Sequence, residues 1–156
     1  MTLGLNACLS AAVPQKYFDR TLTYIQCTPQ FLEHFFAEPD AAFFKSLGLN
    51  CIRIANSYRH FEDDLNPRVL KPDGFRHLDR AVAACAKHGI YTILDMHTAP
   101  GGQNGGWHSD AGTHIANFWV HKDFQDRLVW LWTEIARHYK DEKVRRRLSI
   151  SHPSLL

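Results

Sequence analysis

The fold is indicated most clearly by residues 81–104, which read AVAACAKHGIYTILDMHTAPGGQN. The first part continues an apolar helical stripe that we expect to begin at an Asp73 cap and to stop at Gly89. Ile90–Met96 is a short run of strand-forming residues, and His97 and a glycine-rich connection follow it directly. The stretch therefore predicts a helix, a buried strand and a polar strand end, which is one repeat of an α/β fold.

A similar unit precedes this one and a further helix follows it. Apolar residues recur at helical spacings from residue 31, with a new helical start at Pro39 and a stop at Gly48. Asn50–Ile54 then forms a strand-favouring run, and a third helix begins at Asp123, which we expect to act as its N-cap. The order helix, strand, helix, strand, helix favours parallel strands, in either a doubly wound sheet or a (β/α)8 barrel.

Composition and charge exclude several function classes. The chain has 156 residues, of which 45% are hydrophobic and 22% charged, as in a single globular domain. A net charge of +2 is too small to favour nucleic acid or an anionic membrane as a partner. No apolar run approaches the roughly 20 residues of a membrane helix. The four cysteines lack the close pairs of zinc ribbons, so we expect buried or free thiols; two disulfides of undetermined pairing are the alternative in a secreted protein. We expect no metal and no cofactor, and the compartment stays open.

Two polar residues stand at the ends of the two predicted strands. Arg53 lies in an apolar strand, where its charge needs a carboxylate partner or a polar pocket. A functional site and a purely structural ion pair in a barrel interior both satisfy this need. His97 follows the second strand and fits equally a site residue or a histidine with ordinary hydrogen bonds. Because the carboxyl ends of parallel strands carry the sites of such folds, both are candidates.

The connection at residues 98–110, TAPGGQNGGWHSD, is a candidate binding loop. Its glycines allow turns and close approach to a ligand, but it has neither of the phosphate-binding glycine motifs. Trp107 offers a flat apolar face suited to a sugar ring, while Asn104 and His108 offer hydrogen bonds to hydroxyl groups. The alternative for Trp107 is an anchor that packs the loop onto the core.

Several segments, in the right order, resemble glycoside hydrolase family 5, and most closely its fungal β-glucanases and β-glucosidases. They read LGLNCIRIANSYRHFEDDLNPRVL (47–70), DRAVAACAKHGIYTILDMHTAPGGQN (79–104), WHSD (107–110) and HKDFQDRLVWLW (121–132). The resemblance implies a (β/α)8 TIM barrel that hydrolyses β-glucans or β-glucosides with retention, using two glutamates. It also implies that the charge of Arg53 favours the ionised nucleophile, that His97 contacts the sugar, and that Trp107 and His108 border the substrate cleft. Together with Asn104, whose amide can bind hydroxyl groups, these are the expected substrate-binding residues.

The resemblance covers only part of such a barrel. We expect an irregular N-terminal segment (1–30), the N-terminal part of the barrel (31–141) and a divergent basic tail (142–156). The fold class is thus α/β, a partial (β/α)8 TIM barrel running roughly from its first helix through its third. None of the glutamates occupies the family's catalytic motif (Glu33, Glu38, Glu62, Glu134, Glu142). The acid/base and nucleophile are expected to lie beyond the chain, which would be truncated and inactive alone.

Two other function classes remain open. A non-catalytic glucan-binding or degenerate fragment would use the Trp107 loop without the carboxylates. A metal-dependent hydrolase is suggested by the histidines, including His97, His108, His114 and His121, but their spacing matches no metal-binding motif. The expected partner is a β-glucan or β-glucoside, with no nucleic acid and no membrane.

Overall fold

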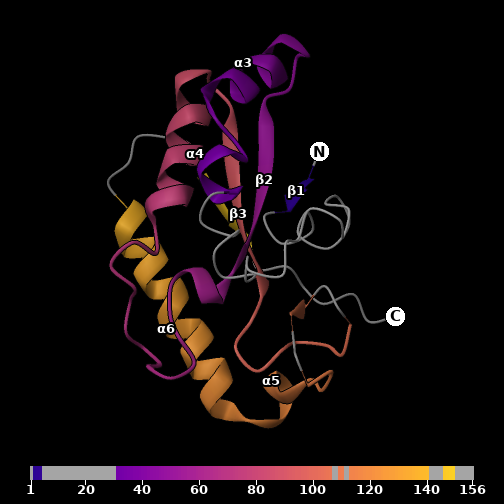
Figure 1. The fold of residues 1–156 in the computed structure, drawn as a ribbon, viewed down its shortest axis with the longest axis vertical. Coiled ribbons are helices and arrows are strands. Elements are labelled where there is room, and N and C mark those ends of the chain that lie inside the picture. The colour runs from indigo at the N-terminus through magenta and orange to yellow at the C-terminus, as the bar shows by residue number, and fades with distance from the viewer. Residues whose placement is uncertain (1, 5–30, 107–108, 111–112, 141–145, 150–156) are drawn as a thin grey trace, which may run out of the picture.

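The computed structural model describes residues 2–4, 31–106, 109–110, 113–140 and 146–149. Its centre is a parallel sheet of four strands in the order β1-β2-β3-β4. The strands are β1 (Thr2–Gly4), β2 (Cys51–Ser57), β3 (Tyr91–Thr98) and β4 (Arg146–Ser149). Helices α4 (Arg76–Lys87) and α6 (Lys122–Tyr139) lie on one side of this sheet, as Figure 1 shows.

Alternation along β2 and β3 separates two faces of the sheet. Ile52 and Ile54 of β2, with Leu94 and Met96 of β3, are buried in the hydrophobic core with the apolar residues of α4 and α6. Residues at the intervening positions therefore point to the other face, which these helices do not cover. The face away from the helices carries the charged and imidazole side chains of both strands, Arg53, Asp95 and His97, so strand alternation positions the candidate site.

The helices begin and end close to the expected signals. In α3 (Glu38–Ser46), Pro39 occupies the first turn and the Asp40 carboxylate accepts a 2.8 Å hydrogen bond from the Ala37 backbone N–H. Gly48 and Gly89 follow α3 and α4 with φ of +78° and +64°, the left-handed conformation that glycine adopts without strain. These stops are confirmed, and each returns the chain to the sheet.

Both expected aspartate caps are wrong. Helix α4 has Phe75 at its N-cap and no side-chain cap bond, and Asp73 contributes only its backbone carbonyl, to the N–H of Arg76. Helix α6 begins at Lys122 after His121, so Asp123 lies inside the first turn, where its carboxylate pairs with Arg68. The negative charge still lies at the positive end of the helix dipole, but its partner is a side chain on a distant loop.

Two strands and one helix were not expected. Strands β1 and β4 lie in the segments described above as an irregular N-terminus (1–30) and a divergent basic tail (142–156), where no strand had been predicted. They are three and four residues long and pair with β2 and β3 through the backbone. Segments this short are too short to show a recognisable apolar pattern in the sequence. The short helix α5 (Asn117–Val120) precedes α6. No described helix has the length and hydrophobicity needed to cross a bilayer.

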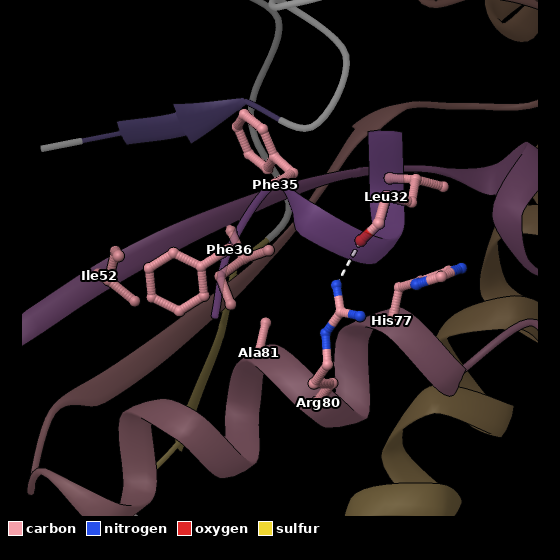
Figure 2. Close-up of a pocket in the computed structure, with 8 residues that line it drawn as sticks. Leu32, Phe35, Phe36, Ile52, His77, Arg80 and Ala81 are labelled. Atoms are coloured by element: carbon pink, nitrogen blue, oxygen red, sulfur yellow. Dashed lines mark hydrogen bonds between the residues drawn. The ribbon is translucent and has the colours of Figure 1, made fainter. Parts of the chain in front are cut away.

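A small apolar cavity lies between residues 31–36, β2 and α4 (Figure 2). Its volume is about 20 Å³, enough for a single water molecule but far too small for a sugar ring. Arg80 closes one side by donating from Nη2 to the carbonyl of Leu32. Because most of its other walls are made by apolar side chains such as Phe36 and Ile52, with His77 at one side, this cavity belongs to the packing of the core.

Candidate functional site

Arg53, Asp95 and His97 form a cluster on the face of the sheet away from the helices. Arg53 Nη2 donates to Asp95 Oδ2, and the same carboxylate oxygen lies 3.2 Å from His97 Nδ1. Arg53 Nη2 also lies 3.4 Å from His97 Nδ1. The Asp95 side chain is completely buried, whereas those of Arg53 and His97 are each 31% exposed. The cluster thus presents a guanidinium and an imidazole to the exterior on a buried carboxylate.

Strand register explains why these groups meet. Strands β2 and β3 run parallel, with Arg53 paired to Ile93 and Ala55 paired to Asp95. Asp95 and His97 are two residues apart and therefore project from the same face of β3. The long Arg53 side chain has only to reach forward along the neighbouring strand to contact both. The carboxylate that the sequence demanded for Arg53 is therefore Asp95.

The cluster is arranged to bind a polar ligand. A guanidinium has five N–H donors, more than the bond to Asp95 uses. His97 Nδ1 lies near both the Asp95 carboxylate, which can only accept, and the Arg53 guanidinium, which can only donate, so these two groups together position the ring. A partly exposed guanidinium and a partly exposed imidazole then lie side by side, and together they can form hydrogen bonds with neighbouring hydroxyl groups of a ligand.

Asp95 was missed among the sequence candidates although a signal was present. It is a carboxylate inside an apolar strand, two positions before a candidate histidine, and strand alternation places such a pair on one face. Buried charges are normally paired. The other predicted strand, residues 50–54, carries one charged residue, Arg53, which also needs a partner. The sequence could therefore have predicted that Asp95 pairs with Arg53.

The strand ends are joined by buried polar contacts. Thr98 Oγ1 donates a 2.6 Å hydrogen bond to Ser57 Oγ, which also accepts from the backbone N–H of Arg59. Asn56 Nδ2 donates to the carbonyl of Ile54, at the point where the pairing of β2 with β3 shifts register. The Thr98–Ser57 bond holds the end of β2 against the end of β3, while the Asn56 bond stays within β2 and stabilises its irregular end.

Gln103 and Asn104 shape the loop that follows β3. Gln103 Nε2 donates to the carbonyl of His97, while its Oε1 accepts from the backbone N–H of Ala99 at 3.0 Å. Asn104 Oδ1 accepts a 2.8 Å bond from the N–H of Gly106. The structure thus gives Asn104 a role in the loop itself, and its contact with substrate remains a prediction. Trp107 and His108 lie outside the described residues.

A buried ion pair connects the loop after β2 to helix α6. Arg127 is 3% exposed and donates from Nε to Glu62 Oε1 at 3.2 Å and from Nη2 to Asp64 Oδ1 at 3.1 Å. The other oxygen of Glu62 accepts from the backbone N–H of Arg68 at 2.9 Å. Burial alone would raise the pKa of Asp64, but hydrogen bonds from Tyr58 and Arg127 and the charge of Arg59 outweigh it and hold the pKa below its ordinary value.

The described glutamates do not form a catalytic pair. Each is engaged in an ion pair: Glu33 with Arg76 and Arg80, Glu38 with Lys87, Glu62 with Arg127, and Glu134 with Arg137. None belongs to β2 or β3. Within the described ranges there is also no group of three or more histidine, cysteine or acidic side chains that could hold a metal ion.

Comparison with known proteins relates this geometry to one family. The profile described as Cellulase (glycosyl hydrolase family 5) matches residues 22–145 of this chain. A beta-xylosidase from Phanerodontia chrysosporium is 75% identical over 112 residues, which make up 72% of this chain and 24% of that protein. Cellodextrinase A from Ruminococcus flavefaciens is 29% identical over 69% of this chain and 30% of its own length.

A solved structure shares the fold. Rutinosidase from Aspergillus niger is similar with a TM-score of 0.64 at 18% sequence identity, covering 74% of this chain and 33% of its own. At that identity the likeness concerns the fold alone. This chain therefore spans between about a quarter and a third of the length of these relatives. Its four-stranded α/β arrangement corresponds to part of a larger α/β enzyme.

Proposed function

Because this chain belongs to glycoside hydrolase family 5, we propose that it takes part in hydrolysing O-glycosyl bonds of β-glucans or β-glucosides. The observation that carries the proposal is the cluster of Arg53, Asp95 and His97 at neighbouring strands of a parallel sheet. In barrels of this kind the carboxyl ends of the strands make the site, and His97, the next-to-last residue of β3, lies at such an end while Arg53 reaches it from within β2. The four described strands would be the first four of the barrel, and of these β2 and β3 lie within the barrel segment at residues 31–141.

In this role the cluster binds and orients the sugar. Arg53 donates to hydroxyl oxygens, and the His97 ring hydrogen-bonds to a neighbouring hydroxyl. Asp95 acts as a positioning residue, because it touches Arg53 and His97 from a fully buried position. The loop after β3, with Asn104, Trp107 and His108, would border the same substrate.

Retaining hydrolysis needs two carboxyl groups about 5 to 5.5 Å apart, one as nucleophile and one as acid/base. The described glutamates are held in ion pairs away from β2 and β3, so they do not supply that pair. We therefore propose that the 156-residue chain alone binds saccharide without hydrolysing it. A glucan-binding function without catalysis is the second candidate that this arrangement favours.

Two classes of sugar, β-glucosides and β-xylosides, are candidates for the substrate. A relative with 75% identity over 112 residues is named a beta-xylosidase, which favours β-xylosides as a second substrate class beside β-glucosides. The two pyranoses differ by the hydroxymethyl group at carbon 5. Both present the adjacent hydroxyls that a donor and acceptor pair can bind.

Calorimetric titration of the chain with laminaritriose, cellotriose and xylotriose tests the binding role. Arg53→Lys keeps the positive charge that Asp95 requires but removes the planar array of donors. Since a hydrogen bond to a charged group contributes about 1.5–3 kcal/mol, we expect at least tenfold weaker binding. The matched control is Arg76→Lys, at an arginine that pairs with Glu33 on the surface. Equal affinities for the two variants would contradict the assignment.

Hydrolysis is measured on the same samples with p-nitrophenyl β-glucoside and p-nitrophenyl β-xyloside. We expect release of nitrophenol at the buffer rate. Turnover well above that rate would show that the chain supplies its own carboxylates and would overturn the proposal of binding alone. Absence of both binding and turnover for every saccharide would reject the glycosidase role of the cluster.

A further inference from the structure

Asn104 and Gly105, in the loop after β3, form the only Asn-Gly pair in the sequence. Asparagine is a thermolabile residue, because the backbone nitrogen of the next residue can displace its side-chain amide. A glycine at that next position has no Cβ to hinder the attack and leaves the backbone free to turn. Gly105 is also exposed, so water reaches this peptide bond. The pair is therefore the asparagine position most open to such a reaction.

The folded loop holds the Asn104 side chain in an arrangement that favours the attack. Asn104 Oδ1 accepts a 2.8 Å hydrogen bond from the Gly106 N–H, which closes a ring across Gly105. This turn folds the side-chain carbonyl back toward the backbone that follows it. The same hydrogen bond stabilises negative charge on Oδ1, as the donors of an oxyanion hole do when an acyl carbon is attacked.

His114 supports this hydrogen bond from the other side of the same peptide group. Its Nδ1 lies 3.2 Å from the Gly105 carbonyl oxygen, and a carbonyl oxygen only accepts, so Nδ1 donates in this contact. The Gly105 carbonyl and the Gly106 N–H belong to one peptide group, and hydrogen bonds in series polarise one another. The His114 contact therefore strengthens the donor that faces Asn104.

The packing of the loop also requires the glycine. A Cβ added at Gly105 would lie 2.6 Å from the backbone carbonyl oxygen of His114, which is too close for any other residue without a backbone shift. The close approach that positions the loop thus keeps at position 105 the residue that makes Asn104 reactive.

We propose that Asn104 is a site of spontaneous deamidation, promoted by the folded loop. The Gly105 nitrogen attacks Cγ of Asn104, its proton passes to Nδ2, and the Cγ–Nδ2 bond breaks so that ammonia leaves. The product is a cyclic succinimide. Water then adds to one of its two carbonyl carbons and opens the ring, which leaves aspartate or isoaspartate at position 104. Water is the only co-reactant.

The reaction changes the charge and the shape of the loop after β3. Either product places a carboxylate at position 104, and isoaspartate also routes the backbone through the former side chain. Ser109 Oγ donates a 2.6 Å hydrogen bond to the Asn104 carbonyl, so a rerouted backbone disturbs a contact that holds the loop. Asn104 is an expected substrate-binding residue; the effect on saccharide binding rests on the proposed function, whereas the reaction itself does not.

The test is incubation of the folded 156-residue chain at alkaline pH beside a synthetic peptide of residues 98–110. Peptide mapping by mass spectrometry follows the gain of about 1 Da at Asn104, and enzymatic methyl labelling follows isoaspartate. We expect Asn104 to react at least as fast in the folded chain as in the peptide, because only the fold supplies the His114 donor. A folded chain that reacts about tenfold more slowly than the peptide would overturn the proposal.

Two other asparagines are controls within the same sample. Asn56 is buried and its Nδ2 donates to the carbonyl of Ile54, so it should react at least about tenfold more slowly than Asn104. Asn66 precedes Pro67, whose nitrogen has no proton to lose, and should not react. Equal rates at Asn56 and Asn104 would contradict the role of the loop.

A pair of variants tests the donor. His114→Phe removes the Nδ1 donor and should slow deamidation about twofold, whereas His34→Phe changes an exposed histidine outside the loop and should leave the rate unchanged. Equal rates in the two variants would count against the contribution of His114 and, with a slow folded chain, against the proposal.

Asn104→Asp reproduces the aspartate product and tests its effect on binding. Titration with laminaritriose should show about threefold to tenfold weaker binding than wild type, as the loss of one neutral hydrogen bond predicts. Deamidation without a change in affinity would support the modification site and count against the substrate contact of Asn104. Weaker binding by Asn104→Asp together with an unchanged mass at Asn104 would overturn the modification site and leave the proposed function standing.

Discussion

Arg127→Met removes the cation from the buried ion pair that connects helix α6 to the loop after β2. The Glu62 side chain is completely buried and that of Arg127 is 4% exposed, so the substitution leaves a buried carboxylate whose remaining contact is the Arg68 N–H. Breaking one side of a buried pair costs about 3–5 kcal/mol. With a urea dependence of about 2 kcal/mol per molar, the unfolding midpoint should fall by about 2 M.

The matched control is Arg137→Met on the same helix. Arg137 pairs with Glu134 three residues away, and its side chain is 65% exposed. Exposed pairs of this kind contribute about 0.3–0.5 kcal/mol, so the midpoint should move by about 0.2 M. Both variants are measured by urea unfolding followed by circular dichroism.

The double variant Glu62→Leu with Arg127→Met completes the cycle. Replacing both partners by apolar groups removes the unpaired charge, so most of the lost stability should return. The reasoning fails if Arg127→Met destabilises no more than Arg137→Met. It also fails if the double variant is as unstable as Arg127→Met alone, because the cost would then lie in lost packing.

Three further predictions concern other parts of the structure. Burial, aided by neighbouring cations, lowers the pKa of His60 to about 4. Between pH 6.5 and pH 4 the unfolded chain therefore binds a proton at His60 that the folded chain does not, so the free energy of unfolding should fall by about 3 kcal/mol as the pH falls across this range. Denaturant unfolding across this range checks it, and His60→Phe should flatten the profile; an unchanged slope would contradict the assignment. Asp95→Asn should lower the free energy of unfolding by about 1–3 kcal/mol, because the Arg53 guanidinium loses its counter-charge. A urea-unfolding midpoint within error of wild type would exclude that role. Gly101→Ala should destabilise more than Gly48→Ala in thermal melts, because both have positive φ but only the former would drive a Cβ into the Phe124 ring; equal losses would argue against the close approach.

Local patterns predicted the central elements well. The helical stripe ending at Gly89 and the apolar run after it correspond to α4 and β3, with boundaries differing by a few residues. Those signals depend on side-chain periodicity and on the backbone conformation of glycine, which are both written in neighbouring residues. The strands extend further than expected, to Ser57 and Thr98, because their polar ends pair with each other by side-chain hydrogen bonds.

Strands β1 and β4 could not be found in this way. Each is short and held at the side of the sheet by backbone pairing, which any non-proline residue provides. The caps failed for a related reason, since the Asp123 carboxylate prefers a cation 55 residues away to the backbone of its own helix. The sequence shows that such a charge needs a partner but does not say which one.

The sequence by itself determined the α/β order, the family resemblance and the demand that the charge of Arg53 be met. The tertiary structure decided which carboxylate pairs with Arg53, namely that of Asp95. Parallel pairing of β2 with β3 places Asp95 and His97 beside Arg53, more than 40 residues along the chain, and folding brings Arg127 to Glu62 across 65. The physical reason is that side-chain periodicity is local, whereas a buried charge is stabilised by whichever opposite charge the packed chain brings within a few ångströms.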